Sequence, residues 1–380
     1  MPHAPTAALD RRHRRVRAEL ATRGLDALVV TALPNILYLT NFSGSSAIVV
    51  VTREQLFFIT DFRYVTAIAE THGTVHECPS LELVRVEGSY DARLADLITA
   101  QGWLRIGFES THLTVQRHQW LVGALGGGQM QARQLEATEG IVEHARVIKD
   151  KYEIAALREG AHRLSSVVRL AIEEVEVGRS EEEVAAAIDG HIRQAGFART
   201  AFDTIVASGP NAALPHHSPG KRKLAEGDLV VLDFGGVYDS YCVDLTRTVV
   251  LGTASARARE VYAAVLEAHD AAIRSVAPGQ SRFEIDAAAR RVLDARGLGD
   301  AFGHGTGHGL GIEVHEDPRI TRRRADVDQH DENVAAGMIF TIEPGAYLAG
   351  WGGVRIEDDV LVTGEGVEVL TRVATDLIEI

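Results

Sequence analysis

The stretch LVVLDFGGVYDSYCVDLTRTVV at residues 229–250 determines the fold around a candidate site. Two apolar runs flank the turn-prone sequence GGVYDS, and this pattern predicts an antiparallel hairpin. Asp233 ends the first run and Asp244 opens the second, so we expect the two carboxylates to face each other. Directly opposite residues have Cβ atoms about 4.5–5.5 Å apart, close enough for both to reach one metal ion. The competing interpretation is a pair of ordinary strand-end and turn aspartates.

Three further residues complete a candidate metal-binding set. His308 lies in FGHGTGHGLGIEVHE, Glu343 in FTIEPGAY and Glu357 in GGVRIEDD. Four carboxylates and one imidazole suit Mn, Co, Fe or Zn better than a thiolate-selected metal. Without cations these like charges would repel one another, and some of the carboxyls would protonate. Two divalent ions roughly 3.5–4 Å apart can hold a hydroxide and polarise a carbonyl, so the set implies metal-assisted hydrolysis.

The segment around His308 alternates glycine with other residues from Gly303 to Gly311. Such a run forms a poor helix, so His304 and His308 are expected on one face of an extended strand. The sequence has no HExxH motif and the segment does not fit GxGxxG, which argues against a mononuclear zinc protease and a dinucleotide site. A surface loop is the alternative interpretation.

Five segments, taken in order, resemble the pita-bread metallopeptidases, in the branch that contains aminopeptidase P and prolidase. The segments are SGPNAALPHH, LDFGGVYDSYCVDLTRT, GHGTGHGLGIEVHE, TIEPGAY and GGVRIEDD. The resemblance covers residues 145–380, with a weaker likeness in the N-terminal part. It implies an α+β fold in which a C-terminal pita-bread (creatinase/aminopeptidase-like) domain follows a smaller α/β creatinase-type domain.

The resemblance also implies the cofactor and its ligands. Two divalent metal ions are expected, with Mn first and Co, Zn or Fe as alternatives. Asp244 and Glu357 would bridge the ions, and Asp233, His308 and Glu343 would complete their shells. Glu343 would also accept the proton of the attacking water, with a metal-bridging hydroxide as the nucleophile. Every ligand position matches, which disfavours the creatine-hydrolysing relatives that lack these metals.

Three histidines outside the metal shell are implied to be catalytic. His216, His304 and His315 match family histidines that polarise the scissile carbonyl or hold the tetrahedral intermediate. His217 follows His216 directly, and adjacent residues of an extended segment point to opposite faces. We therefore expect His217 to lie away from the chemistry.

Three other residues are assigned supporting roles by the same resemblance. Arg355 resembles an arginine that orients a ligand carboxylate from behind the metal shell. Tyr347 is expected to form a hydrogen bond near the site as a substrate contact. Arg319, in HEDPRI, could supply the positive charge that grips the carboxylate of a dipeptide substrate.

The chain is expected to contain two domains and a linker, as its 380 residues suggest. Residues 1–134 read as an α/β domain with short apolar strands in ALVVTAL, NILYLTNFSG, SAIVVVT and QLFFITDFRY. The resemblance implies that this domain shapes the substrate entrance and the dimer contact. Residues 135–148 are the expected linker, and residues 149–380 the catalytic domain. A capping box at Ser180 and Glu183 predicts the start of a helix there.

Composition limits the partners of the chain. The net charge of −14 argues against a nucleic-acid interface, which needs clustered Lys and Arg. The basic run Arg11 to Arg17 is expected on a solvated helix face. Two cysteines are too few for a disulfide framework, and no segment has the apolar length of a membrane span or signal core. A cytoplasmic enzyme without a membrane partner is expected, and the resemblance implies a homodimer.

The expected activity is cleavage of the Xaa-Pro bond at peptide N-termini, as in aminopeptidase P. The substrates would be peptides with proline at the second position. An Xaa-Pro amide has no N–H and a fixed φ, so it does not fit the extended clefts of general proteases. Prolidase, which requires a dipeptide, is the alternative. Methionine aminopeptidase and a metal-free peptide-binding relative remain further alternatives.

Overall fold

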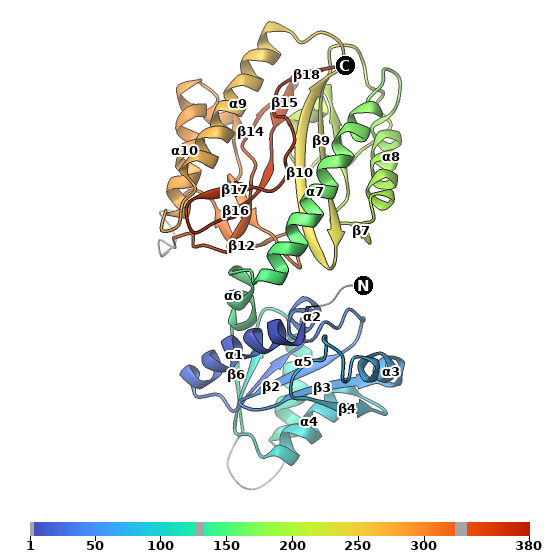
Figure 1. Cartoon of the computed structure of the whole chain (residues 1–380), viewed down its shortest axis with the longest axis vertical. Coiled ribbons are helices and arrows are strands. Elements are labelled where there is room, and N and C mark those ends of the chain that lie inside the picture. Colours follow the sequence, from blue (N-terminus) through green and yellow to red (C-terminus); the bar gives the residue numbers. More distant parts are fainter. Residues whose placement is uncertain (1–3, 127–132, 324–332) are drawn as a thin grey trace. The chain divides into compact units, whose positions relative to one another are not determined.

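The computed structural model describes residues 4–126, 133–323 and 333–380, and its internal contacts divide the chain into two units (Figure 1). The first unit is Met1–Arg146 and the second is Val147–Ile380. The segment 135–148, expected as a linker, instead carries most of strand β6 (Gln134–Thr138) and all of helix α6 (Ile141–Val147). The change of unit therefore falls at the end of α6.

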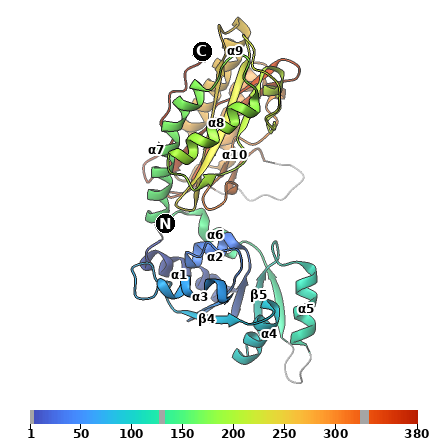
Figure 2. The same cartoon turned by 90° about the vertical axis from the view of Figure 1, so that its right-hand side faces the viewer.

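The N-terminal unit is built on a six-stranded mixed sheet in the order β4-β3-β2-β1-β5-β6. Strand β2 is antiparallel to β1 and β3, and the other neighbouring strands are parallel. Helices α4 and α5 lie beside the sheet (Figure 2). Each adds two buried leucines to the core formed by the strands. The remaining bounds are β1 Ala27–Val30, β2 Ile48–Thr52, β3 Leu56–Asp61, β4 Leu81–Val86, β5 Arg105–Glu109, α1 Thr6–Arg23, α2 Leu33–Thr40, α3 Phe62–Glu70, α4 Tyr90–Gln101 and α5 Val115–Leu125. The expected α/β sheet covered by helices is confirmed.

Two local expectations for this unit are wrong. The apolar run NILYLT forms helix α2 instead of a strand, because a proline stands in its first turn and a short apolar run carries no periodicity that separates helix from strand. The basic run is not fully solvated, since Arg12 and His13 are buried. Arg12 donates to the carbonyl of Tyr38 at 2.9 Å, and the His13 ring lies 2.7 Å from the carbonyl of Leu39. Helix α1 therefore packs on the end of α2 through polar groups.

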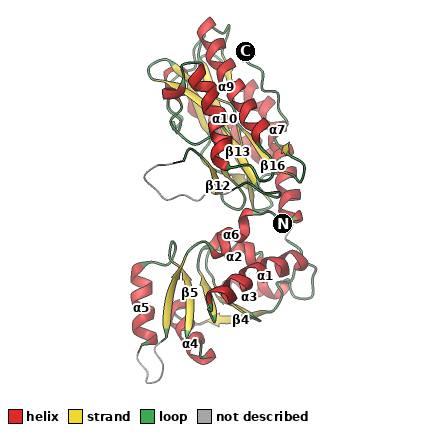
Figure 3. Ribbon diagram, turned by 90° about the vertical axis from the view of Figure 1, so that its left-hand side faces the viewer, coloured by secondary structure: helices red, strands yellow, loops and turns green. Residues whose placement is uncertain are grey.

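The C-terminal unit has the α+β pita-bread architecture (Figure 3). Its described residues form two five-stranded sheets and one two-stranded sheet. In the first, β18-β10-β9-β7 are neighbours and β8 also pairs with β9; the second has the order β12-β11-β13-β16-β17, and β14 pairs with β15. The strands are β7 Arg199–Thr200, β8 Ile205–Ser208, β9 Leu229–Tyr238, β10 Tyr241–Val250, β11 Gly307–Gly309, β12 Glu316–Ile320, β13 Ile339–Ile342, β14 Gly345–Leu348, β15 Gly352–Arg355, β16 Asp358–Val362, β17 Val367–Val369 and β18 Ile378–Glu379. The helices are α7 Lys151–Glu173, α8 Glu181–Gln194, α9 Ala256–Ser275 and α10 Arg282–Ala295.

Helices α7 and α8 cover one face of the β9–β10 hairpin. Leu232, Phe234, Val243 and Leu245 point into this core, and each buried side chain of this size contributes about 1.5–3 kcal/mol to folding. Both helices begin with a capping box, and the one at Ser180 confirms the expected helix start. Since side chains alternate along a strand, the hairpin's other face is left for the candidate site.

Within the described residues, no helix combines the length and the apolarity that crossing a membrane requires.

Candidate metal centre

The β9–β10 hairpin supplies two of the expected ligands, in a different register from the one expected. Both strands continue to a two-residue turn at Asp239 and Ser240, whose φ angles are +48° and +70°. Asp233 is therefore opposite Thr246, and Asp244 is opposite Gly235. The two aspartates are diagonal neighbours on one face, which typically lie about 7–8 Å apart at their Cα atoms. They can share a site between them, but they do not face each other directly.

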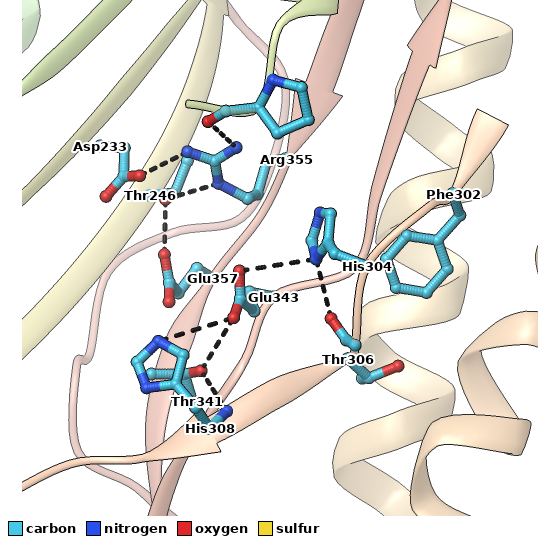
Figure 4. A network of polar contacts seen from close by, with 12 residues as sticks. Asp233, Thr246, Phe302, His304, Thr306, His308, Thr341, Glu343, Arg355 and Glu357 are labelled. Carbon is cyan, nitrogen blue, oxygen red and sulfur yellow. Dashed lines mark hydrogen bonds and ion pairs between the residues drawn. The ribbon is translucent and has the colours of Figure 1, made fainter. Parts of the chain in front are cut away.

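The other three expected ligands come from the second sheet and its connections. His308 lies in β11, Glu343 follows β13, and Glu357 lies between β15 and β16. One ligand atom each from Asp244, His308 and Glu357 lies within 4.8 Å of the others. His308 Nε2 is 3.6 Å from Glu343 Oε1 (Figure 4) and 4.0 Å from Asp244 Oδ2. All five expected ligands, Asp233 included, border one cavity of about 750 Å³.

The protonation of this set fits divalent cations. Burial and the neighbouring carboxylates raise the pKa of Asp244 and of Glu357 well above the usual range, and burial raises the pKa of Glu343 to about 7. Asp244 Oδ1 is buried without a hydrogen-bond partner among the described residues. A cation would satisfy this oxygen and neutralise the charges that raise these pKa values.

The histidine of the set also fits a metal ligand. His308 Nδ1 is 3.1 Å from the carbonyl of Gly309, and since a carbonyl only accepts, this nitrogen carries the proton. The lone pair then lies on Nε2, which points towards the carboxylates. Burial lowers the pKa of His308 to about 3, which keeps the ring neutral. A metal-ligating histidine needs this tautomer and an orienting hydrogen bond of this type.

Arg355 contacts the carboxylate of Asp233, one of the candidate ligands. Its guanidinium forms an ion pair with Asp233, and its Nε donates to Thr246 Oγ1 at 3.2 Å. Thr246 Oγ1 in turn donates to Glu357 Oε2 at 2.6 Å (Figure 4). The sequence analysis missed Thr246, although its position two residues after Asp244 places it on the same face of the strand.

A second buried group behind the ligands was also missed. Asp359 accepts a hydrogen bond from the backbone N–H of Asp244 at 3.1 Å. Arg247 donates to the carbonyl of Glu357 at 2.7 Å and pairs with Asp358 at 2.8 Å. These contacts fix the backbone at both bridging candidates. The EDD run that follows the last ligand motif is the signal that could have found them.

The three expected catalytic histidines all border the cavity. His304 lies in the loop before β11, so the expectation of one extended strand through both His304 and His308 is wrong. Its Nδ1 lies 2.8 Å from the carbonyl of Gly305 and its Nε2 lies 2.9 Å from the Tyr347 hydroxyl. Nδ1 therefore carries the proton, and Nε2 accepts from Tyr347. Burial lowers the pKa of His304 to about 4, so the ring is neutral.

His216 and His315 have side chains that are accessible from the cavity. His315 packs against the His308 ring with centroids 4.4 Å apart. His217 also borders the cavity, but its Nε2 is bound 2.8 Å from Glu181, a fully buried carboxylate at the start of α8. His216 and His217 thus have different surroundings, and His217 has a structural partner.

Arg319 lies on β12 directly opposite His308 of β11 and borders the cavity. Its guanidinium has no hydrogen-bond or ion-pair partner among the residues that the structure describes. Its charge contributes to the lowered pKa values of His308 and His315. A free cation therefore stands beside the candidate ligands, as expected for a carboxylate-binding group.

Comparison with known proteins identifies the family. Residues 155–364 match Metallopeptidase family M24, and residues 12–148 match the Creatinase/Prolidase N-terminal domain. The Xaa-Pro dipeptidase of Pyrococcus furiosus is 40% identical over 65% of this chain and 69% of its own length. A solved Xaa-Pro dipeptidase from Bacillus anthracis is 34% identical, with a TM-score of 0.91 over 98% of this chain and 100% of that one.

A solved X-Pro aminopeptidase from Thermotoga maritima is 30% identical, with a TM-score of 0.84 over 94% of this chain and 98% of that one. Similarity to Xaa-Pro peptidases thus extends through both units. The chain belongs to metallopeptidase family M24, in its pita-bread Xaa-Pro peptidase branch.

Proposed function

We propose that this metallopeptidase is an Xaa-Pro dipeptidase that hydrolyses the bond between any first residue and a C-terminal proline. The sequence favoured the aminopeptidase P type, but dipeptidases predominate among the named relatives, which supports the alternative instead. The observation that carries the proposal is the free guanidinium of Arg319 beside the candidate ligands. A dipeptide ends in a carboxylate one residue after the scissile bond, and an arginine binds a carboxylate through two parallel hydrogen bonds.

We propose two divalent ions as the cofactor, with Mn expected first and Co, Zn or Fe as alternatives. Asp233, Asp244, His308, Glu343 and Glu357 would hold them, with Asp244 and Glu357 shared. When bound, such ions supply a nucleophilic hydroxide at neutral pH and polarise the scissile carbonyl. The five side chains approach from two sheets, and four carboxylates balance the charge of two divalent cations. Metal content of the purified protein tests the stoichiometry.

Proton transfer and stabilisation of the carbonyl oxygen would be carried out by side chains that border the cavity. Glu343 is the proposed proton acceptor, because its carboxylate borders the cavity among the candidate ligands, where an attacking water would lie within reach. His304 accepts from Tyr347 in the structure, so we assign it to holding the Tyr347 hydroxyl, which Arg355 also contacts at 2.9 Å. Stabilisation of the carbonyl oxygen then falls to His216 and His315, whose side chains are accessible from the cavity.

The decisive experiment removes the interaction between Arg319 and the substrate carboxylate in two ways, by changing the enzyme and by changing the substrate. Hydrolysis of Ala-Pro is compared with that of Ala-Pro-amide and Ala-Pro-Ala, using wild type and Arg319→Gln. A dipeptidase should cleave Ala-Pro preferentially, and the substitution should lower kcat/KM for Ala-Pro by roughly 10²-fold, because charged hydrogen bonds contribute about 1.5–3 kcal/mol each. The amide should be much less affected. Arg169→Gln, on the exposed face of α7, is the matched control.

Aminopeptidase P activity is the second candidate. It is favoured by the full-length similarity to the X-Pro aminopeptidase of Thermotoga maritima. Two results together would establish this candidate and reject the dipeptidase. Wild type would cleave Ala-Pro-Ala in preference to Ala-Pro, and Arg319→Gln would lower kcat/KM equally for Ala-Pro and Ala-Pro-amide. We also keep the homodimer as a proposal, which light scattering on the purified chain tests.

A further inference from the structure

The edge of the first sheet carries an insertion beside the ligands. Thr200 of β7 pairs with Gly236, and Ile205 of β8 pairs with Asp233. Four residues of the edge segment therefore stand opposite two residues of β9. Surplus residues of this kind leave the ladder and bend the segment, and such bulges often turn side chains towards active sites. Phe202 and Asp203, in the middle of the insertion, both border the cavity.

The insertion is anchored on both sides. The N–H of Ala201 donates to the carbonyl of Gly235 at 3.0 Å. Thr204 Oγ1 donates to Asp189 of α8 at 2.6 Å, so the Thr204 side chain points away from the cavity. These contacts hold Phe202 and Asp203 between two fixed points. Phe202 and Asp203 therefore form an anchored part of the cavity wall.

Phe202 forms an apolar surface next to the candidate ligands. A Cβ atom placed on Gly235 would lie 2.7 Å from Phe202 Cε1, so the ring covers this glycine. Gly235 is directly opposite Asp244, and Ile205, also in the cavity wall, is opposite Asp233. A side chain entering beside the two aspartates would therefore meet an aromatic ring and an isoleucine.

Asp203 places a negative charge at this apolar surface. Its carboxylate is exposed and has no hydrogen-bond or ion-pair partner among the described residues. Of the described carboxylates that border the cavity, it is the one outside the candidate metal set. Arg319 stands on the other sheet, so the two walls carry opposite free charges. A substrate whose proline carboxylate binds Arg319 would direct its first side chain away from that wall.

We propose that Phe202, Ile205 and Asp203 select lysine or arginine as the residue before proline. The long apolar stem of such a side chain would pack on the ring and the isoleucine, and its cationic end would reach the carboxylate. A cation near an aromatic face gains further attraction. This inference rests on the proposed function, because the residue before proline is defined only for an Xaa-Pro substrate.

The test compares two substrates that differ only in the terminal ammonium group of the first side chain. The kcat/KM values of Lys-Pro and norleucine-Pro are measured with wild type, Asp203→Asn and Asp203→Lys. Wild type should prefer Lys-Pro by roughly two- to fivefold, the range expected of an exposed ion pair. Asp203→Asn should bring the ratio of kcat/KM for Lys-Pro to that for norleucine-Pro close to one. Asp203→Lys should lower this ratio below one, and Glu-Pro, measured in addition, should then be its preferred substrate. The ratio is measured on one sample, so loss of folded or metal-loaded enzyme cancels.

Glu173→Gln, which removes a negative charge from the exposed surface of α7, should leave the ratio at its wild-type value. Equal cleavage of Lys-Pro and norleucine-Pro by wild type would overturn the inference and leave the proposed function standing. An equal loss on both substrates in Asp203→Asn would also overturn it, since Asp203 would then act on a group common to all substrates. No cleavage of either dipeptide would reject the proposed function itself.

Discussion

Each unit contains a buried carboxylate, Glu109 in the N-terminal unit and Asp244 in the C-terminal unit, and the two have different surroundings. In the N-terminal unit, Glu109 accepts hydrogen bonds from the backbone N–H groups of Thr31 and Ala32 at 2.7 and 2.8 Å, and from Asn35 Nδ2 at 2.7 Å. In the C-terminal unit, Asp244 has one oxygen without a described partner and is surrounded by other acids. The protein supplies hydrogen-bond donors to the Glu109 carboxylate, whereas Asp244 Oδ1 receives none from the described residues and is free to bind a cation.

The number of hydrogen-bond donors around a buried carboxylate separates the structural acid Glu109 from the candidate metal ligand Asp244. Burial raises the pKa of both groups, so the direction of the shift does not distinguish them. The surroundings do, because donors around Glu109 stabilise its ionised form whereas the acids around Asp244 oppose ionisation. Neutralising Glu109 should therefore harm the fold, and neutralising Asp244 should harm the function and relieve the metal-free fold.

The largest effect is expected for the bridging candidates. Asp244→Asn and Glu357→Gln should each lower metal occupancy and reduce activity by more than roughly 10²-fold, since even groups that only support a ligand often cost 10–100-fold. In metal-free protein, each substitution should raise the melting temperature, because it removes a carboxyl group whose ionisation is opposed by burial and by the neighbouring acids. Metal analysis, kinetics and thermal unfolding provide the three readouts. Wild-type metal content and activity in either variant would show that the site is misassigned.

Chelation is the matched test on the unchanged protein. Activity should disappear on removal of metal and return with Mn²⁺ or Co²⁺, and metal addition should stabilise wild type more than Asp244→Asn. Full turnover by metal-free protein would refute the metal-dependent mechanism.

The next largest effect is expected for the accessible histidines. His315→Ala should lower kcat by about 10²–10³-fold with metal content retained, as typical for the loss of a group that stabilises a developing oxyanion. His217→Ala is the contrasting variant, because the His217 ring contacts the buried Glu181. Loss of this ring should lower the free energy of unfolding and leave kcat, measured per folded molecule, close to the wild-type value. Equal losses of kcat at both positions, measured per folded molecule, would contradict this division of roles.

The sequence named five candidate ligands, which the fold brings to one cavity, because these residues lie in motifs whose chemistry follows from residue type and order. It misplaced the register at Asp233 and Asp244 because it took all of GGVYDS as the turn. The actual turn, Asp239–Ser240, uses two residues with positive φ, which aspartate and serine signal less strongly than Asn-Gly. The periodic helices and the capping box at Ser180 were predicted because both are local signals.

Tertiary contacts explain what the sequence missed. The run NILYLT became helix α2 where Glu109, from a distant strand, accepts from the N–H of Ala32 at the helix start. The interaction of His304 with Tyr347 and the support of Asp244 by Asp359 join residues that are far apart in the chain. Such pairs have no local signature, so only the folded structure assigns them.

A moderate loss of stability is expected when Glu109 is neutralised. Glu109→Gln places an NH₂ group either where the N–H groups of Thr31 and Ala32 point or where Asn35 Nδ2 points. Either orientation leaves a buried donor without an acceptor, which costs about 1–3 kcal/mol. The N-terminal unit should unfold at lower denaturant concentration, with faster hydrogen exchange in α2 and β5. Metal content should match wild type, since the cluster belongs to the other unit. A variant with unchanged stability would show that donor count does not separate the two carboxylates.

The effect that is smallest at neutral pH concerns His13, a buried histidine that serves as a structural counterpart to His308. Burial lowers the pKa of His13 from 6.5 to about 4, so the folded ring stays neutral while the unfolded ring gains a proton below pH 6.5. Its contribution to stability is therefore complete above pH 6.5 and declines as the pH falls from 6.5 to about 4. Within that window the slope reaches about 1.4 kcal/mol per pH unit for one proton. His13→Gln can still donate to the carbonyl of Leu39 but does not titrate, so its unfolding free energy should depend less on pH by this amount. Measuring the difference between wild type and variant at each pH cancels the titration of all other groups, and parallel curves would show that His13 titrates alike in both states.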